Sequence, residues 1–240
     1  MRLLRIATFC FFLIGHIFGA VAFDNKATAG PTTSSSPSIT SASTTGSNLI
    51  GIAWFAHNDN TTTFITGTPT WGGSNMTYVT RVVLSAGTGR VLEMWRIVAP
   101  ATGAQTVSGT WATSVRWKMA AITYTGVDQT TPLGTAVTAT TTLGTSVTVD
   151  ISSASGELVI SGVLNNDGTT ALTQGAGETE RFEDNSGAND VAIAGSDEAG
   201  AATVTMSYSG SNDRWATIGA PLKPVSASVP AKKGAHHFGV

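Results

Sequence analysis

Residues 115–124, with the sequence VRWKMAAITY, decide the fold class. Two sets of side chains alternate along this stretch, namely Val115, Trp117, Met119 and Ala121 on one face and Arg116, Lys118, Ala120 and Ile122 on the other. A period of two is the spacing of a pleated strand, because successive side chains point to opposite faces of a sheet. The stretch therefore predicts a β-strand with one wholly apolar face.

Runs of the same kind recur along the chain, at residues 49–55, 77–84, 90–99, 105–111, 135–141, 146–151, 157–164, 178–182, 191–194, 202–208 and 215–222. Turn-forming Gly and Pro separate them, and no window has a sustained apolar repeat at helical spacing. We expect an all-β protein, a two-sheet antiparallel sandwich that is jelly-roll-like and has about ten to twelve strands. No internal repeat of fixed period is evident.

The composition fits one folded domain of this class. The chain has 240 residues, of which 41% are hydrophobic and 12% are charged, with a net charge of −2. That hydrophobic content excludes a disordered chain. No basic stripe is present, so no nucleic-acid partner is expected. The acidic residues gather between positions 157 and 198, where we expect them in solvated loops and at strand edges.

The N-terminus has the order of a secretory signal peptide. Arg2 and Arg5 precede an apolar run at residues 6–22, which ends in the small residues Ala20-Val21-Ala22. We expect residues 1–22 to be removed and the protein to be secreted, at an extracellular, cell-surface or virion-surface location. The alternative is an uncleaved anchor, although a spanning helix needs about 20 apolar residues; membrane contact is expected only in that case.

The remaining organisation follows from composition. Cys10 lies in the leader, so the mature chain has no cysteine, which favours a bacterial or phage-related origin. Residues 23–47 are a Ser/Thr-rich segment, either a flexible linker or an edge strand near residues 38–42. Residues 48–224 form the predicted sandwich domain, and residues 225–240 form a flexible tail.

Four motifs occur in a characteristic order, at residues 71–77 (WGGSNMT), 93–103 (EMWRIVAPATG), 124–134 (YTGVDQTTPLG) and 215–224 (WATIGAPLKP). In that order the chain resembles a loosely defined group of secreted bacterial and phage-associated β-sandwich domains, over about residues 48–224. The resemblance implies a jelly-roll-like sandwich and an extracellular or virion-surface setting. It implies no catalytic residues.

Catalytic chemistry has few candidate residues. A serine nucleophile would need a positioned base, and His57 is the only histidine between the leader and the tail. A glycosidase needs two acids across a cleft, and Glu93 is the best single carboxylate because it alternates within an apolar strand. The competing interpretation, which we favour, is that Glu93 forms an ion pair with Arg81, Arg96 or Arg116 on a neighbouring strand. We therefore expect no enzymatic activity.

Two weaker binding sites are also predicted. Asp59 and Asp167 stand in Asn/Asp-rich loops that offer oxygen ligands, so one structural calcium ion is the only cofactor considered, although such residues are also common in turns. Trp71 and Trp111 lie near strand ends and are candidates for an exposed sugar-stacking surface, whereas Trp54, Trp95 and Trp215 are expected in the core.

These features predict a non-enzymatic extracellular structural or adhesive surface protein, a subunit of a filament, a matrix or a virion surface. The expected partners are further copies of the chain or other surface proteins, with assembly by strand addition from the Ser/Thr-rich segment. The alternative is a carbohydrate-binding jelly-roll module whose partners are glycans. An enzyme that acts on polysaccharide is the third hypothesis.

Overall fold

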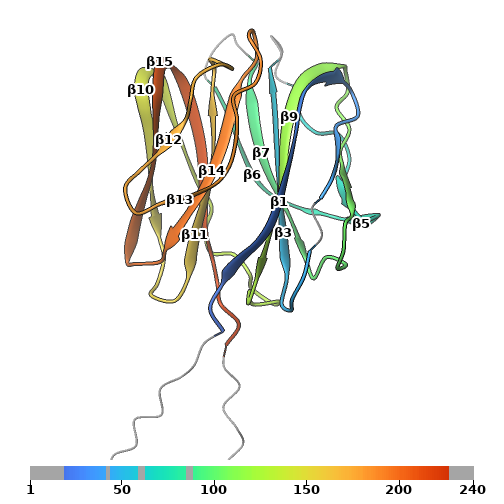
Figure 1. Cartoon of the computed structure of the whole chain (residues 1–240), viewed down its shortest axis with the longest axis vertical. Helices are drawn as coiled ribbons and strands as arrows, with labels where there is room; N and C mark the ends of the chain where they lie inside the picture. The colour runs from blue at the N-terminus through green and yellow to red at the C-terminus, as the bar shows by residue number, and fades with distance from the viewer. Residues whose placement is uncertain (1–18, 42–43, 59–62, 85–88, 227–240) are drawn as a thin grey trace, which may run out of the picture.

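The computed structural model describes residues 19–41, 44–58, 63–84 and 89–226, and it confirms the all-β antiparallel sandwich. Two sheets face each other as two layers (Figure 1). The described residues form fifteen strands, of which ten have six or more residues. The expected ten to twelve strands correspond to these longer ones, because two- and three-residue strands leave little trace of alternation in a sequence.

Sheet 1 has five strands in the order β1-β9-β3-β7-β6. Their bounds are Ala22–Ser34 for β1, Ile50–Asn58 for β3, Thr77–Val83 for β6, Val91–Val98 for β7 and Val115–Thr125 for β9. A small sheet, in the order β2-β8-β4-β5, covers its outer face, with β2 at Ser38–Thr40, β4 at Thr70–Trp71, β5 at Ser74–Asn75 and β8 at Thr106–Ser108. The first part of the Ser/Thr-rich segment is thus an edge strand of sheet 1, and its second part belongs to the small sheet.

Sheet 2 has the order β10-β15-β11-β14-β13, and β12 pairs with β15. The bounds are Val137–Ser152 for β10, Leu158–Asn165 for β11, Thr173–Gln174 for β12, Thr179–Asp184 for β13, Ala192–Ala199 for β14 and Thr203–Leu222 for β15. Strands β10 and β15 each join two runs that the sequence predicts as separate strands. The pairing register shifts on both sides of Gly144, between the two halves of this ribbon.

Each sheet is built from one contiguous half of the chain, blue to green for sheet 1 and yellow to red for sheet 2 in Figure 1. This routing differs from a jelly roll, in which strands from both halves share a sheet. Moreover, the strand order is the same in both sheets. When the five long strands of each half are numbered along the chain, both sheets have the order 1-5-2-4-3. The fold is therefore a structural duplication, which the sequence analysis did not detect.

The duplication extends to the pairing register. In sheet 1, Ile50 lies opposite Val98 and Tyr124. In sheet 2, Leu158 lies opposite Ala199 and Leu222. Counting from these positions, the dipeptide Arg-Trp occurs at equivalent places in β9 and β15, at residues 116–117 and 214–215. The edge strands β6 and β13 also carry a register shift at the same point, between Tyr78 and Thr80 and between Glu180 and Phe182.

The two-stranded ribbon of β10 and β15, which folds over the outer face of sheet 2, has a counterpart in sheet 1. The first part of β10 pairs with the last part of β15, as β1 pairs with β9, and the rest of β10 and β15 pair with each other over the outer face of the sheet, as β2 and β8 do. In the first half that outer pair is separated into the short strands β2 and β8. Apolar clusters consequently fill both outer faces as well as the space between the sheets.

Trp54 and Gly162 hold equivalent positions in the two halves and touch each other between the sheets. A Cβ atom on Gly162 would come within 2.7 Å of the Trp54 ring. A residue that contacts its own equivalent lies on the pseudo-twofold axis that relates the two sheets. One sheet therefore supplies the large side chain at this point, and the other supplies the space for it.

The two ends of the described chain lie together. A Cβ atom on Gly19 would approach Val225 to 2.9 Å, and the Val225 backbone N–H donates to the Gly126 carbonyl. The beginning of β1 and the end of β15 both point to the lower end of the view in Figure 1. Among the residues described, no helix has the length and apolarity needed to cross a membrane.

The pseudo-twofold axis predicts the outcome of a residue swap. W54G should cost at least about 4 kcal/mol because it leaves a cavity, and G162W should be destabilising because its ring meets Trp54. The double variant W54G/G162W should recover more than about 1 kcal/mol relative to the sum of the two, since the ring then enters the same space from the other sheet. Urea unfolding of the four proteins measures this coupling, and strictly additive values would contradict the proposed axis.

Candidate functional site

Glu93 lies on the outer face of sheet 1, in the middle of strand β7. Its neighbours in register are Phe55 on β3 and Arg81 on β6. Glu93 is only 2% exposed. The alternation that singled out Glu93 in the sequence is therefore real, and it places the carboxylate beneath the small sheet and the loop before β4.

Two N–H groups of the chain hold the carboxylate. The Ile65 backbone N–H donates to Oε1 at 2.8 Å, and the Trp95 indole Nε1–H donates to Oε2 at 3.2 Å. Burial raises the pKa of Glu93, and these two hydrogen bonds and the charge of Arg81 oppose the rise only in part. The expected ion pair is wrong: within the described chain, no Lys or Arg nitrogen lies within 4 Å of Glu93, because N–H donors occupy both oxygens instead.

An open hollow of about 220 Å³ lies above this carboxylate. It is lined by Ile65, Tyr78, Arg81, Glu93 and Trp95, and we call it the Glu93 pocket. Tyr78 is 43% exposed and packs edge-on against Trp95, with 5.1 Å between the ring centroids. Across the pocket, the Arg81 guanidinium lies 3.4 Å from the centroid of the Phe64 ring. The pocket thus combines an acceptor floor, an aromatic rim and a cationic wall.

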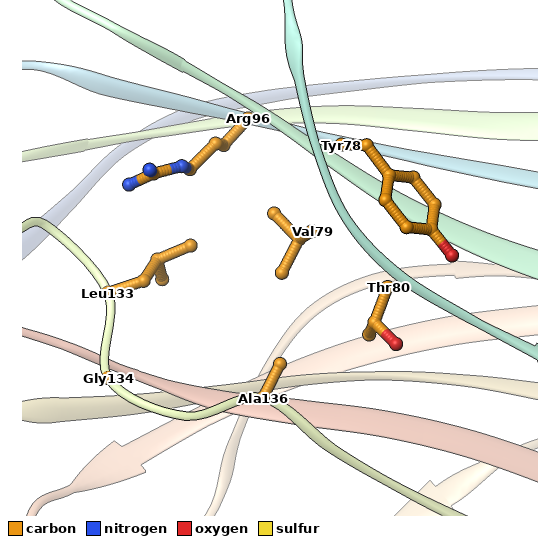
Figure 2. Close-up of a pocket in the computed structure, with 7 residues that line it drawn as sticks. All are labelled: Tyr78, Val79, Thr80, Arg96, Leu133, Gly134 and Ala136. Carbon is orange, nitrogen blue, oxygen red and sulfur yellow. The ribbon is translucent and has the colours of Figure 1, made fainter.

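A second hollow of about 310 Å³ borders strand β6, and it is lined by Tyr78, Val79, Thr80, Arg96, Leu133, Gly134 and Ala136 (Figure 2). Figure 2 shows the ring of Tyr78 on the opposite side of the β6 ribbon from Val79 and Arg96. Tyr78 therefore forms part of both hollows, whereas Arg96 belongs to the second alone. The register shift between Tyr78 and Thr80 widens the strand at this point.

The predicted sugar-stacking residues lie elsewhere. Trp71 and Trp111 are each 2% exposed and belong to the apolar cluster beneath the small sheet. The expectation that these rings are exposed is wrong, because both rings pack between the small sheet and sheet 1, with Trp71 reaching down from β4 onto Gly51 of β3. The core positions expected for Trp54, Trp95 and Trp215 are confirmed, although the edge of Trp95 also reaches the Glu93 pocket.

Of the two predicted calcium ligands, the structure describes Asp167 alone. Asp59 lies outside the described residues. Asp167 accepts hydrogen bonds from the hydroxyl and the backbone N–H of Thr169, and these bonds lower its pKa. The part of the chain that is described contains no group of three or more His, Cys, Asp or Glu residues able to hold a metal ion. Asp167 has the local geometry of a turn residue.

His57, the candidate base, is buried at the far end of β3. Its Nε2 lies 2.6 Å from the Thr63 carbonyl oxygen, and its ring packs edge-on against Trp111. His57 is 1% exposed; it lies on the same outer face of sheet 1 as Glu93 but does not line the Glu93 pocket. Glu93 and His57, the two titratable residues that the sequence offers for catalysis, therefore do not line the same pocket.

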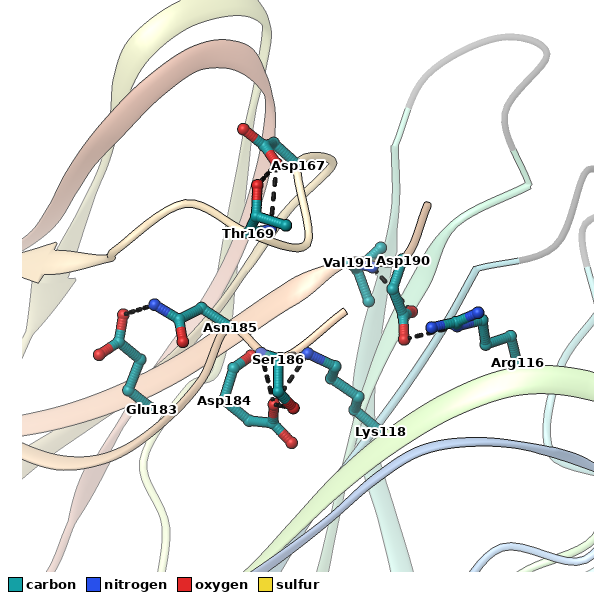
Figure 3. A network of polar contacts seen from close by, with 10 residues as sticks. All are labelled: Arg116, Lys118, Asp167, Thr169, Glu183, Asp184, Asn185, Ser186, Asp190 and Val191. Carbon is teal, nitrogen blue, oxygen red and sulfur yellow. Dashed lines mark hydrogen bonds and ion pairs between the residues drawn. The ribbon is translucent and has the colours of Figure 1, made fainter. Parts of the chain in front are cut away.

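Buried ion pairs join the sheets beside β9 (Figure 3). Lys118 is 0% exposed, and its Nζ donates to Asp184 Oδ1 at 2.8 Å and to the Asp184 carbonyl at 3.0 Å. Arg116 Nε donates to Asp190 Oδ2 at 3.0 Å. Burial tends to raise the pKa of Asp184, but hydrogen bonds from Lys118 and Ser186 outweigh it and hold that pKa below its ordinary value.

These pairs correct the expectation that the late acidic residues are solvated. Asp190 and Asp197 are buried, and Asp197 pairs with Arg181. The basic partners of Asp190 and Asp184 were visible in the sequence, because Arg116 and Lys118 interrupt one face of an otherwise apolar strand. The acids could not be assigned to them, since they come from the half of the chain that forms sheet 2. The contact of Tyr78 with Trp95 could not be predicted for a similar reason, because the two residues lie on different strands, β6 and β7.

Comparison of this chain with protein-family models, with curated proteins and with solved structures finds no match.

The Lys118–Asp184 pair is expected to contribute to stability only as a pair. K118M should destabilise the fold by about 3 kcal/mol, because it leaves a carboxylate in the interior without its ammonium partner. The double variant K118M/D184N removes both charges and should be more stable than K118M. Urea unfolding at neutral pH gives both values; a double variant no more stable than K118M would show that the pairing itself is not what matters.

Glu93 should make stability depend on pH in a defined direction. Its folded pKa is raised above the unfolded value of about 4.3, so the folded state holds the proton more tightly. The stability it contributes is complete below that unfolded pKa and is lost as pH rises through the folded pKa. In E93Q this loss should be absent. Urea unfolding of both proteins between pH 4 and pH 8 tests the sign, and parallel pH profiles would contradict it.

Proposed function

We propose that this chain is a non-enzymatic extracellular surface protein of structural or adhesive type, in which a rigid sandwich presents a shallow binding pocket. The proposal keeps the extracellular setting that the leader and the resemblance imply. The Trp54–Gly162 contact and the Lys118–Asp184 pair fill space between the sheets, whereas the Glu93 pocket opens on the outer face of sheet 1.

The observation that carries the proposal is the way Glu93 is held. Each carboxylate oxygen accepts a hydrogen bond from an N–H group of the chain itself. These bonds fix the carboxylate as a hydrogen-bond acceptor at the floor of an open pocket. A glycosidase would need a second carboxyl group across the cleft, but among the described residues that line the Glu93 pocket, Glu93 itself is the one carboxyl group. Fixed acceptors beside an exposed aromatic ring suit recognition better than proton transfer.

Assembly by strand addition takes a more specific form in this proposal. Residues 22–34 pair with β9 of the same chain, so they can join another copy only by exchange of β1 between copies. Ala27 and Ala121 are Cα partners across that pair. The second candidate function, carbohydrate binding, is favoured by the Glu93 pocket and moves from Trp71 and Trp111 to Tyr78.

Expression of the full chain with A27C/A121C tests export and assembly together. We expect the protein outside the cell with Phe23 as its first residue, and oxidation to give disulfide-linked ladders because β1 of one copy pairs with β9 of the next. N-terminal sequencing and non-reducing electrophoresis provide the measurements, with A27C alone as the control. Protein retained inside the cell would overturn the extracellular role. Single chains with an internal disulfide at every concentration would overturn the exchange of β1.

A further inference from the structure

We propose that the Glu93 pocket is a subsite for one ring of a neutral saccharide. This inference rests on the proposed adhesive function and names the ligand of the same pocket. The physical juxtaposition that carries it is a fixed carboxylate, a guanidinium and an exposed aromatic ring around one open hollow.

The floor of the pocket has unused hydrogen-bonding capacity. An ionised carboxylate offers about four acceptor sites, and the N–H groups of Ile65 and Trp95 occupy two of them. Both donors are groups of the chain, so they hold the carboxylate in one orientation before a ligand arrives. The remaining acceptor sites face the hollow and suit the hydroxyl groups of a ligand, which can donate without carrying a charge.

The charges of the pocket favour a neutral ligand. Arg81 and Glu93 lie directly opposite each other in the β6–β7 pair, and both line the hollow. A cationic ligand would be attracted by Glu93 and repelled by Arg81, and an anionic ligand would meet the reverse. A vicinal diol can donate to the carboxylate and accept from the guanidinium at the same time. Neutral sugars provide this arrangement of adjacent hydroxyl groups.

The rim of the pocket supplies the apolar contact that such a ring needs. Tyr78 presents an exposed ring that is braced edge-on by Trp95, and Arg81 is braced by the Phe64 ring. A pyranose has one face of C–H groups that packs well on an aromatic surface, while its hydroxyl groups lie at the periphery. The bracing reduces the freedom that these side chains would lose on binding.

The size of the hollow indicates a single ring. About 220 Å³ is below the roughly 300 Å³ at which pockets for larger ligands begin. The neighbouring hollow is separated from it by strand β6 and carries Arg96, which does not line the Glu93 pocket. Arg96 is therefore a matched control for Arg81, because its loss removes the same charge from the same edge of the sheet.

The test uses the secreted full chain and follows the Trp95 indole N–H signal by NMR during titration with methyl hexopyranosides. We expect the methyl glycosides of glucose, galactose or mannose to shift this signal with a Kd of about 1 mM. Glucosamine and glucuronic acid should bind at least about tenfold more weakly, because each carries a charge that one wall repels. E93Q and Y78A should each weaken binding about tenfold, whereas R96A should change it less than about twofold.

Several results separate the failure of this inference from the failure of the proposed function. If no neutral glycoside shifts the Trp95 signal at about 50 mM in the folded protein, the saccharide subsite is wrong, while export and assembly still stand. Equal losses of glycoside affinity in R96A and R81A would also overturn the saccharide subsite, since the pocket would then act only through net charge. If the glycoside binds and is hydrolysed, as mass spectrometry of the mixture would show, the subsite stands and the non-enzymatic role fails.

Discussion

The contact of Trp54 with Gly162 determines how the two sheets can meet. Sandwich layers pack about 10 Å apart, and an indole on the inner face fits that spacing only where the opposite strand has no side chain. Because the contact lies on the pseudo-twofold axis, it fixes the position of every other strand relative to its equivalent. The inner faces are consequently committed to packing, and recognition is left to the outer faces.

The two outer faces have diverged although the strands beneath them correspond. In sheet 2 the folded β10–β15 ribbon covers a polar cluster in which Ser161, Ser196 and Tyr208 bond to one another. In sheet 1 the equivalent area is only partly covered, and it forms the Glu93 pocket. The positions that correspond to Tyr78, Arg81, Glu93 and Trp95 are occupied by Glu180, Glu183, Ala194 and Ser196. One outer face of the duplicated unit is thus covered by a ribbon over a polar cluster, and the other leaves the Glu93 pocket open.

The sequence predicts the strands well because alternation is a local property, as residues 115–124 illustrate. It does not predict what depends on contacts between distant segments. The halves share an order of strands and a register rather than a constant spacing, so the duplication left no fixed period in the sequence. Trp71 and Trp111 are buried because short strands with little alternation, β4 with Trp71 among them, pack on the outer face of sheet 1. The burial of Glu93 within an apolar strand was predicted, but the donors that hold it come from a loop and from its own strand.

The proximity of the two described chain ends has a mechanical consequence. Tension applied between Gly19 and Val225 would open the pair Ala22–Thr125 first in β1, and the pair Leu222–Leu158 first in β15. The hydrogen bonds of each strand would then break one after another, as in a zipper, rather than all at once, as in shear. A sandwich that is pulled by both ends in this way unfolds at low force. A chain that must withstand tension would therefore need to be attached to its surroundings through one end only.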